Sequence, residues 1–291
     1  DHLAQIGSLA QKGPEMTQRD DSTGLSGTAG VARAMTIAGS DSGGGAGVQA
    51  DLKSFAAMGV YGTSVLTAIT AQNTVAVTDV MELPVSIIES QIDAVISDIG
   101  TDAVKTGMLS SAAIIEAVAG KVKEHGLGNL VVDPVMVAKS GDKLLQDEAV
   151  GVLRDLLVPL ATLVTPNIPE AEALTGLKIE GLDDAREAAI AIVGMGAKAV
   201  VVKGGHMAGP ASDIFYDGEE FRVFTAQRIS TTSTHGTGCT FASATAAGLA
   251  RGMSLRDSVS QAKKYVTDAI RRAFPMGRGY GPLNHFHEFW D

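Results

Sequence analysis

The chain has 291 residues, enough for a full α/β core, and 45% of them are hydrophobic, which is typical of a folded globular protein. Its net charge of −10 and its lack of any Lys/Arg-rich run argue against non-specific nucleic-acid binding, which depends on neutralising phosphates. A single cysteine excludes an internal disulfide framework, and no apolar run approaches the roughly 18 residues of a membrane span. We therefore expect a cytoplasmic protein without nucleic-acid or membrane partners.

The first 32 residues differ in composition from the rest of the chain. They mix Gln, Gly, Ser, Thr and Asp with one short apolar patch, and the chain opens on Asp1 rather than Met. No basic segment followed by an apolar one predicts a signal peptide. We interpret residues 1–32 as an N-terminal extension that we expect to be flexible, left by processing, by expression design or by cutting from a longer fusion. Residues 33–291 are then one domain.

From residue 34 onward, short β-branched runs alternate with amphipathic helical patterns. The nearly continuous apolar runs 130–132 and 199–202 are typical of a parallel sheet that is covered on both faces. We predict a doubly wound α/β fold, a mostly parallel sheet flanked by helices, with a β-hairpin turning at Asp217-Gly218. The expected strands are 35–38, 60–70, 74–83, 103–106, 129–133, 161–165, 198–203, 212–217 and 220–226, and the expected helices are 48–58, 84–99, 111–124, 146–157, 169–175, 183–195, 237–250 and 255–272.

Residues 234–240 read THGTGCT and lead directly into an alanine-rich helical stretch. The first backbone N–H groups of a helix have no partner inside it, and glycines let a polyanion approach them closely. Gly236, Thr237 and Gly238 therefore predict a phosphate site. At Cys239 the positive helix end would favour a thiolate, which makes this residue a candidate base. The alternative is a turn that only caps a helix, with Cys239 as an inert packed residue.

Ligands of open α/β sheets bind beyond the carboxyl ends of the strands. Gly45, Gly47 and Ala50 formally match the dinucleotide fingerprint, but no acidic residue follows at the required spacing, so a nicotinamide or flavin site is disfavoured. At any single strand end, the Gly, Pro, Asn and Asp residues can be explained by the requirements of a turn alone. Together, a Gly-rich anion loop, carboxylates able to hold hydrated magnesium and lysines on one rim are the components of phosphoryl transfer. The turns in question begin at Gly39, Ala71, Lys105, Asp133, Thr165 and Lys203.

Eight ordered segments carry a resemblance to a known family. Together they closely resemble the hydroxymethylpyrimidine/phosphomethylpyrimidine kinases of thiamine biosynthesis, members of the ribokinase-like superfamily, from about Ala34 to Trp290. At Gly43 the chain departs from relatives that often carry a serine. The segments are TIAGSDS (36–42), GGAGVQADLK (44–53), TAQNT (70–74), KTGML (105–109), DPVM (133–136), PNIPEA (166–171), KGGH (203–206) and THGTGCT (234–240).

The resemblance implies a pyrimidine pocket. Gln72 resembles the residue that hydrogen-bonds the aminopyrimidine, and its amide can donate and accept at one ring edge. Asp51, Met108 and Val135 resemble the rest of the pocket, with Met108 as a polarizable face for the ring. Plain core packing is the alternative for Met108 and Val135. Cys239 stands where other ribokinase-like enzymes place a catalytic aspartate, in the loop that the resemblance identifies as the anion hole.

The resemblance also implies a site for ATP and Mg²⁺. Asn167 and Glu170 match an Asn-x-x-Glu element that organises magnesium and the nucleotide phosphates, helped by Asp133. Lys203 resembles a lysine near those phosphates, a role that a compact cation suits. Residues 139–141 would lie on a loop that closes over the substrate, and the resemblance suggests a homodimer.

The implied activity is ATP- and magnesium-dependent phosphorylation of 4-amino-5-hydroxymethyl-2-methylpyrimidine, and then of its monophosphate to the pyrophosphate. The competing interpretation is a pyridoxal kinase, because pyridoxal is also a flat heteroaromatic with a hydroxymethyl group. Some such relatives trap the aldehyde with a second cysteine, whereas residue 138 here is alanine and Cys239 is the only cysteine. A non-catalytic pyrimidine-binding protein is a third hypothesis, against which Cys239, Asn167 and Lys203 argue.

Overall fold

The structure is a computed structural model that describes residues 30–138, 140–142, 144–205 and 210–290. Residues Ala32–Asp291 group into one compact unit. The predicted N-terminal extension lies outside the described residues except for residues 30–32, and so do Lys139 of the predicted lid and His206.

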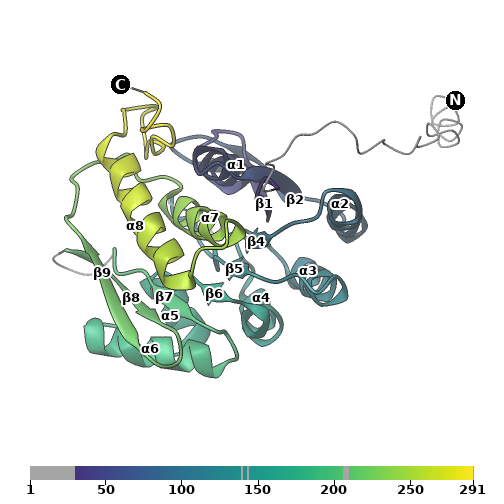
Figure 1. The fold of residues 1–291 in the computed structure, drawn as a ribbon. Helices are drawn as coiled ribbons and strands as arrows, with labels where there is room; N and C mark the ends of the chain where they lie inside the picture. The colour runs from purple at the N-terminus through teal and green to yellow at the C-terminus, as the bar shows by residue number, and fades with distance from the viewer. Residues whose placement is uncertain (1–29, 139, 143, 206–209, 291) are drawn as a thin grey trace, which may run out of the picture. The chain divides into compact units, whose positions relative to one another are not determined.

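The described residues form one sheet of nine strands in the order β3-β2-β1-β4-β5-β6-β7-β8-β9 (Figure 1). The six strands from β2 to β7 in this order are parallel, and antiparallel strands complete both edges. This confirms the predicted fold class. The strands are β1 (Arg33–Asp41), β2 (Tyr61–Gln72), β3 (Val77–Glu82), β4 (Ala103–Thr106), β5 (Leu130–Val132), β6 (Leu163–Val164), β7 (Val200–Val202), β8 (Ala211–Tyr216) and β9 (Phe221–Ala226).

Helices cover both faces of the sheet, and each face has its own apolar cluster (Figure 1). Side chains of α1, α7 and α8 share the cluster on one face, and those of the other helices build the cluster on the opposite face. The continuous burial of β4, β5 and β7 follows from this double cover. The helices are α1 (Gly47–Ala57), α2 (Val85–Asp98), α3 (Ala112–Glu124), α4 (Asp147–Val152), α5 (Ile168–Thr175), α6 (Leu182–Gly194), α7 (Thr237–Ala250) and α8 (Leu255–Arg271).

Helix α7 is the helix that positions the site. Its residues from Thr240 to Leu249 are all buried, and most of them are Ala, Ser, Thr or Gly. Small side chains let the helix pack closely on β1, β4 and β5 while α1 and α8 lie against its flanks (Figure 1). A Cβ added at Gly248 would lie 3.1 Å from the Cα of Ser258 in α8, which shows how close this packing is. The α7 N-terminus is thereby fixed near the carboxyl ends of the central strands.

The predicted hairpin near Gly218 and the predicted helix 146–157 have different outcomes in the structure. The predicted hairpin is confirmed, because β8 and β9 pair antiparallel around a turn in which Gly218 has a φ of 92°. The predicted helix 146–157 is wrong in its second half. The α-helix ends at Val152 and continues as a π-helical turn, Leu153–Leu157, and a 3₁₀ turn, Val158–Leu160. Pro159 has no N–H with which to continue the α-helical ladder.

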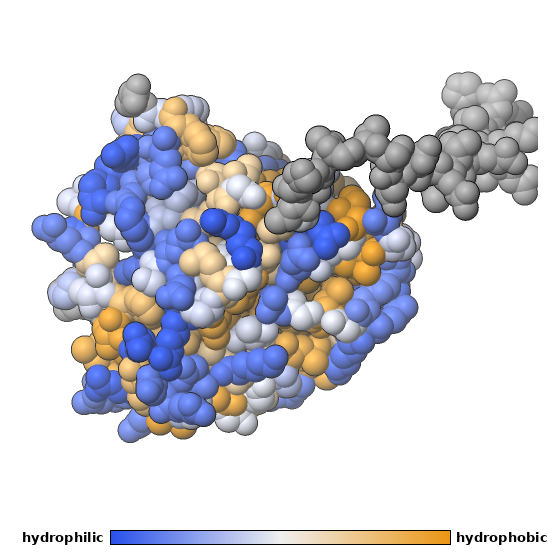
Figure 2. Space-filling view, viewed as in Figure 1, coloured by the Kyte–Doolittle hydropathy of each residue, from blue (hydrophilic) through white to orange (hydrophobic). Residues whose placement is uncertain are grey.

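The surface view in Figure 2 shows hydrophilic side chains interspersed with separate apolar patches. In the part of the chain that the structure describes, no helix is both long and apolar enough to cross a membrane.

Candidate active site

The Gly-rich turn opens α7 as the sequence predicts. Gly236 has a φ of 81°, in the left-handed region, and a Cβ there would lie 1.8 Å from the carbonyl oxygen of Gly45, so this position requires glycine. The helix begins at Thr237, and no described residue accepts a hydrogen bond from the backbone N–H of Gly238 or of Cys239. Free N–H groups at the positive end of a helix form an anion site.

A hydrogen bond between Asp41 and His235, which no sequence motif indicated, joins the two Gly-rich loops. Asp41, the last residue of β1, lies with Oδ2 2.8 Å from Nε2 of His235. The same oxygen accepts from the backbone N–H groups of Gly45 (3.0 Å) and Ala46 (2.8 Å). Burial opposes the charge, but His235 and the backbone N–H groups outweigh it and lower the Asp41 pKa. This carboxylate therefore fixes the first loop against the anion loop.

The start of α7 faces a lysine–carboxylate pair at the carboxyl ends of β5 and β7. Lys203 Nζ lies 2.8 Å from Oδ1 of Asp133, and Thr165 Oγ1 donates to the same oxygen over 3.1 Å. A Cβ added at Gly238 would lie 3.1 Å from Lys203 Nζ and 3.5 Å from Asp133 Oδ2. Burial lowers the Lys203 pKa, but Asp133 and then Glu170 more than compensate, so the pKa is raised and the ammonium stays charged. A phosphoryl group at this turn would therefore meet N–H donors and a cation.

Glu170 stands beside this pair at the start of α5. Asn167 Oδ1 accepts from the backbone N–H of Glu170 (2.9 Å), and Glu170 Oε2 accepts from the backbone N–H of Asn167 (2.8 Å), which is a capping box. Burial raises the Glu170 pKa to about 7; Lys203 opposes this shift and Asp133 adds to it. A buried carboxyl beside a second carboxylate gains much from a divalent cation, and both are hard oxygen donors. Glu170 and Asp133 thus fit a magnesium site.

A second lysine–carboxylate pair lies under the anion loop and is sealed from solvent. Lys105 Nζ is 3.0 Å from Oδ1 and 2.8 Å from Oδ2 of Asp51, and both side chains are fully buried. Thr36 Oγ1 donates to Asp51 over 2.6 Å, and Ser243 of α7 also donates to it over 2.5 Å. In the structure Asp51 thus has no exposed surface, and its contact with a pyrimidine stays a prediction.

The surroundings of Cys239, which is half-buried, oppose the thiolate that the helix end would favour. Loss of solvent raises the Cys239 pKa to about 11. Lys105 and the backbone N–H of Gly47 favour the thiolate, but the carboxylates of Asp51 and Asp133 oppose it. The helix dipole is a local feature that the sequence predicts, whereas these two negative charges come from residues far from Cys239 in the chain. Cys239 is therefore a thiol at neutral pH.

The predicted pyrimidine residues lie around the ends of β1, β2 and β5. Gln72 is half-buried at the end of β2, with Nε2 3.4 Å from Nε2 of His235. The thioether of Met108 lies against Gly39, where an added Cβ would be 2.5 Å from its methyl carbon. Val135, half-buried, follows Asp133 in the loop after β5. Their roles toward a substrate stay predictions.

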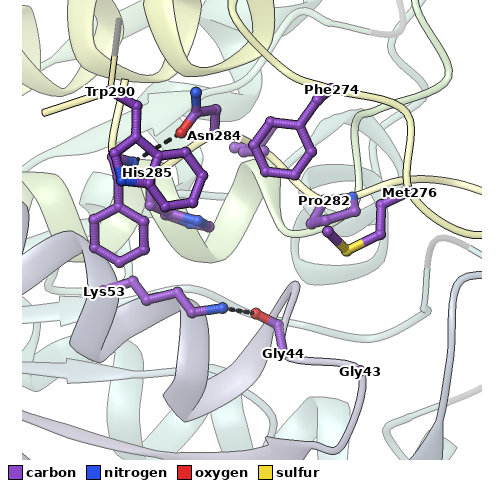
Figure 3. Close-up of a pocket in the computed structure, with 11 residues that line it drawn as sticks. Gly43, Gly44, Lys53, Phe274, Met276, Pro282, Asn284, His285 and Trp290 are labelled. Atoms are coloured by element: carbon purple, nitrogen blue, oxygen red, sulfur yellow. Dashed lines mark hydrogen bonds between the residues drawn. The ribbon is translucent and has the colours of Figure 1, made fainter. Parts of the chain in front are cut away.

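A cavity of about 150 Å³ lies beside the first Gly-rich loop (Figure 3). Lys53 extends across it from α1, and its Nζ donates to the carbonyl oxygen of Gly44 over 2.7 Å. Residues of the C-terminal segment, among them His285 and Trp290, line the opposite side. The predicted site residues do not line this cavity, so it is distinct from the candidate phosphoryl site.

Among the described residues, another group of potential metal ligands is Asp93, Glu124 and His125, between α2 and α3. Lys121 Nζ lies 2.8 Å from Asp93 and 3.0 Å from Glu124. These residues form an ion-pair network in which the side chains of Asp93 and Glu124 are 45% and 60% exposed.

Several solved structures that are similar to this chain are vitamin kinases. The chain is similar to an ADP complex of Bacillus subtilis pyridoxal kinase, with a TM-score of 0.84 and 41% identity over 90% of this chain and 100% of that one. It is also similar to phosphomethylpyrimidine kinase from Clostridium difficile 630, with a TM-score of 0.74 and 47% identity over 82% and 99% of the two chains. The fold and the site therefore define a phosphotransferase of the ribokinase-like class.

The sequence comparisons identify the family within this class. The pattern of the phosphomethylpyrimidine kinase family matches residues 41–284. The hydroxymethylpyrimidine/phosphomethylpyrimidine kinase of Bacillus subtilis is 49% identical over 258 residues, which cover 88% of this chain and 95% of that protein. The thiamine biosynthesis bifunctional protein ThiED of Geobacter sulfurreducens is 55% identical over 252 residues, 86% of this chain, but the chain spans only 51% of that protein. The chain belongs to the phosphomethylpyrimidine kinase family.

Proposed function

We propose that this chain transfers the γ-phosphoryl group of ATP to the hydroxymethyl oxygen of 4-amino-5-hydroxymethyl-2-methylpyrimidine, and then phosphorylates the monophosphate to the pyrophosphate. The observation that carries the proposal is that the start of α7 lies beside the Lys203–Asp133 pair. A Cβ added at Gly238 would be only 3.1 Å from Lys203 Nζ. Phosphoryl transfer depends on positioning and charge neutralisation, which N–H donors and an ammonium supply at one point. The family relatives named for these two substrates support the choice of acceptor.

ATP is the proposed phosphoryl donor and Mg²⁺ the proposed metal. A pyridoxal kinase from Staphylococcus aureus, solved with AMP-PCP and pyridoxal, is 38% identical to this chain with a TM-score of 0.83. Asp133 and Glu170 would hold the ion through hard oxygen atoms, and Asn167 fixes Glu170 through the capping box. When bound, magnesium would neutralise charge on the phosphates. Lys203 would stabilise charge on the transferring group.

Cys239 is the proposed proton acceptor for the hydroxymethyl group. Only the thiolate of Cys239 can accept that proton, and because its pKa is about 11, the thiolate is a minor form near neutral pH. Lys105 beneath the loop favours this thiolate form, which becomes a thiol when it takes the proton. The second acceptor is a phosphate oxygen that is already ionised near neutral pH, so the second step needs little base.

The test is identification of the products by mass after incubation with the hydroxymethylpyrimidine and Mg-ATP. We expect the monophosphate to appear first and the pyrophosphate to follow. The Lys203→Met variant serves as the matched control for contaminating kinases. Unchanged substrate after prolonged incubation with wild-type protein that is folded by circular dichroism would contradict the proposal.

Pyridoxal is the second candidate acceptor. It is favoured by the similarity to pyridoxal kinases of Bacillus subtilis and Staphylococcus aureus, which exceeds 0.8 in TM-score in both comparisons. Residue 138, in the predicted lid, is alanine, and the chain has no second cysteine. Comparing kcat/KM for pyridoxal and the hydroxymethylpyrimidine decides between them, and we expect the pyrimidine to be preferred. We further expect a homodimer in the cytoplasm, for which sedimentation of the purified protein tests the oligomeric state.

A further inference from the structure

The amide of Gln72 is held between two polar neighbours, Thr70 and His235. Its Oε1 lies 3.2 Å from Thr70 Oγ1, and its Nε2 lies 3.4 Å from His235 Nε2. The backbone of Gln72 is fixed by Ser42, whose Oγ accepts from its N–H and donates to its carbonyl, both over 2.8 Å. Rotation of the amide by 180° is therefore the main freedom left to this end of the side chain. Oxygen and nitrogen have nearly the same size, so the neighbours decide which way it faces.

Thr70 can only accept a hydrogen bond from Gln72. A hydroxyl has one proton, and the buried Thr70 Oγ1 lies 2.8 Å from the carbonyl oxygen of Ser40, which is an acceptor only. That proton is therefore committed to Ser40. A lone pair of Thr70 Oγ1 then faces the Gln72 amide and requires an N–H there.

His235 can only donate to Gln72. Its Nε2 lies 2.8 Å from Asp41 Oδ2, and the Asp41 carboxylate is ionised because His235 and backbone N–H groups lower its pKa. Nε2 must then carry the proton, since two acceptors would otherwise face each other. A protonated Nε2 has no lone pair with which to accept from the Gln72 amide 3.4 Å away, so the amide oxygen, not the NH₂, suits this side. Thr70 and His235 therefore favour the same orientation of the Gln72 amide.

We propose that Thr70 and His235 are positioning residues that fix the Gln72 amide with Nε2 toward Thr70 and Oε1 toward His235. In this orientation one N–H of Gln72 and one lone pair of its Oε1 remain free. They form a donor and acceptor in a fixed order, which complements the ring nitrogen and amino group at an aminopyrimidine edge. The reversed orientation would present the two groups in the opposite order. The specificity consequence rests on the proposed function, whereas the orientation itself does not.

The orientation is measured directly by nuclear Overhauser contacts of the Gln72 side-chain NH₂ in the wild-type protein. Contacts to the Thr70 methyl group support the proposal, and contacts to the His235 ring proton in their place overturn it. Thr70→Ser, which keeps the hydroxyl, identifies the methyl signal by its loss. This measurement needs no substrate, so its outcome is separate from that of the proposed function.

The consequence for specificity is measured by a double-mutant cycle. Thr70→Val removes the hydroxyl at nearly constant volume, and we expect it to raise KM for the hydroxymethylpyrimidine about 3- to 10-fold while kcat stays within about twofold. Thr70→Ser should restore the wild-type KM. In a Gln72→Leu background, Thr70→Val should have no further effect. An equal KM increase in both backgrounds would overturn the positioning role, because the hydroxyl would then act without Gln72.

Discussion

Two lysine–carboxylate pairs lie against the start of α7, and they differ in access rather than in chemistry. Lys105 and Asp51 are fully buried, and hydroxyls of Thr36 and Ser243 complete the shell around Asp51. Lys203 keeps 16% of its side chain exposed, and its Nζ lies beside Gly238 at the start of α7. A lysine–carboxylate pair can therefore stabilise the anion loop when it is buried beneath it, or contact a bound phosphate when it is accessible to solvent.

The two lysine–carboxylate pairs also differ in whether their charged groups have partners within the protein. The partners of the sealed pair all come from within the protein, so its charges favour one packed arrangement and are costly to separate. At the rim, Glu170 is buried beside Asp133 with a raised pKa, so this side gains from a further cation. The two pairs consist of the same residue types. The Lys203–Asp133 pair differs from the Lys105–Asp51 pair in its solvent access and in the buried carboxyl group beside it that lacks a cation.

Breaking the sealed pair should have the largest effect on stability. Lys105→Met leaves the Asp51 carboxylate buried without its cation, and we expect the free energy of unfolding to fall by about 3–5 kcal/mol. Denaturant titration measures the loss. The double variant Asp51→Asn/Lys105→Met removes both charges and should recover much of it. If Lys105→Met is as stable as wild type, the pair does not support the loop.

Removing the rim lysine should affect catalysis far more than stability. We expect Lys203→Met to lower kcat for the first phosphorylation by about 10²- to 10³-fold, because a preorganised cation at the transferring group is lost. The free energy of unfolding should change less than in Lys105→Met. Steady-state kinetics and denaturant titration on the same samples provide the check. A Lys203→Met variant with normal turnover would remove the rim pair from the mechanism.

Glu170 should make stability and magnesium use depend on pH. Its pKa is raised from 4.5 to about 7 in the folded protein, so the folded state binds more protons than the unfolded state between these values. Its contribution to stability is thus present below about pH 4.5 and is lost as the pH rises through 7. Glu170→Gln should abolish this component in thermal unfolding across that range. It should also lower turnover about tenfold and raise the magnesium concentration for half-maximal rate.

Cys239 should show a difference between the two steps. Cys239→Ser keeps the N–H groups of the loop, so nucleotide binding should persist while the first phosphorylation slows at least about tenfold. The second phosphorylation should slow less, because its acceptor is already anionic. Separate assays with each acceptor test this. Equal losses in both steps, or none, would exclude the thiol as a base.

The sequence predicted the sheet and the loops at its strand ends because apolar periodicity and turn residues are local signals. It did not predict the pairing of Asp41 with His235, since these residues lie 194 positions apart and only the fold brings them together. Lys105 carried a signal that was not used. It is a charged residue inside an otherwise uncharged buried strand, Ala103–Thr106, and such a residue needs a buried partner. The pKa of Cys239 depends on Lys105, Asp51 and Asp133, which only the fold brings close to it.

The central claim is that the phosphoryl group is held jointly by the free N–H groups at the start of α7 and by Lys203 beside them. Gly238→Ala tests it most directly, because Gly238 has no left-handed φ and alanine suits a helix better than glycine, so the fold should be kept or slightly stabilised. Its methyl group would lie 3.1 Å from Lys203 Nζ, within the space assigned to phosphate. We predict that the rate of the first phosphoryl transfer, measured by rapid quench at saturating Mg-ATP, falls at least about tenfold. Transfer at the wild-type rate by a folded Gly238→Ala variant would contradict the account.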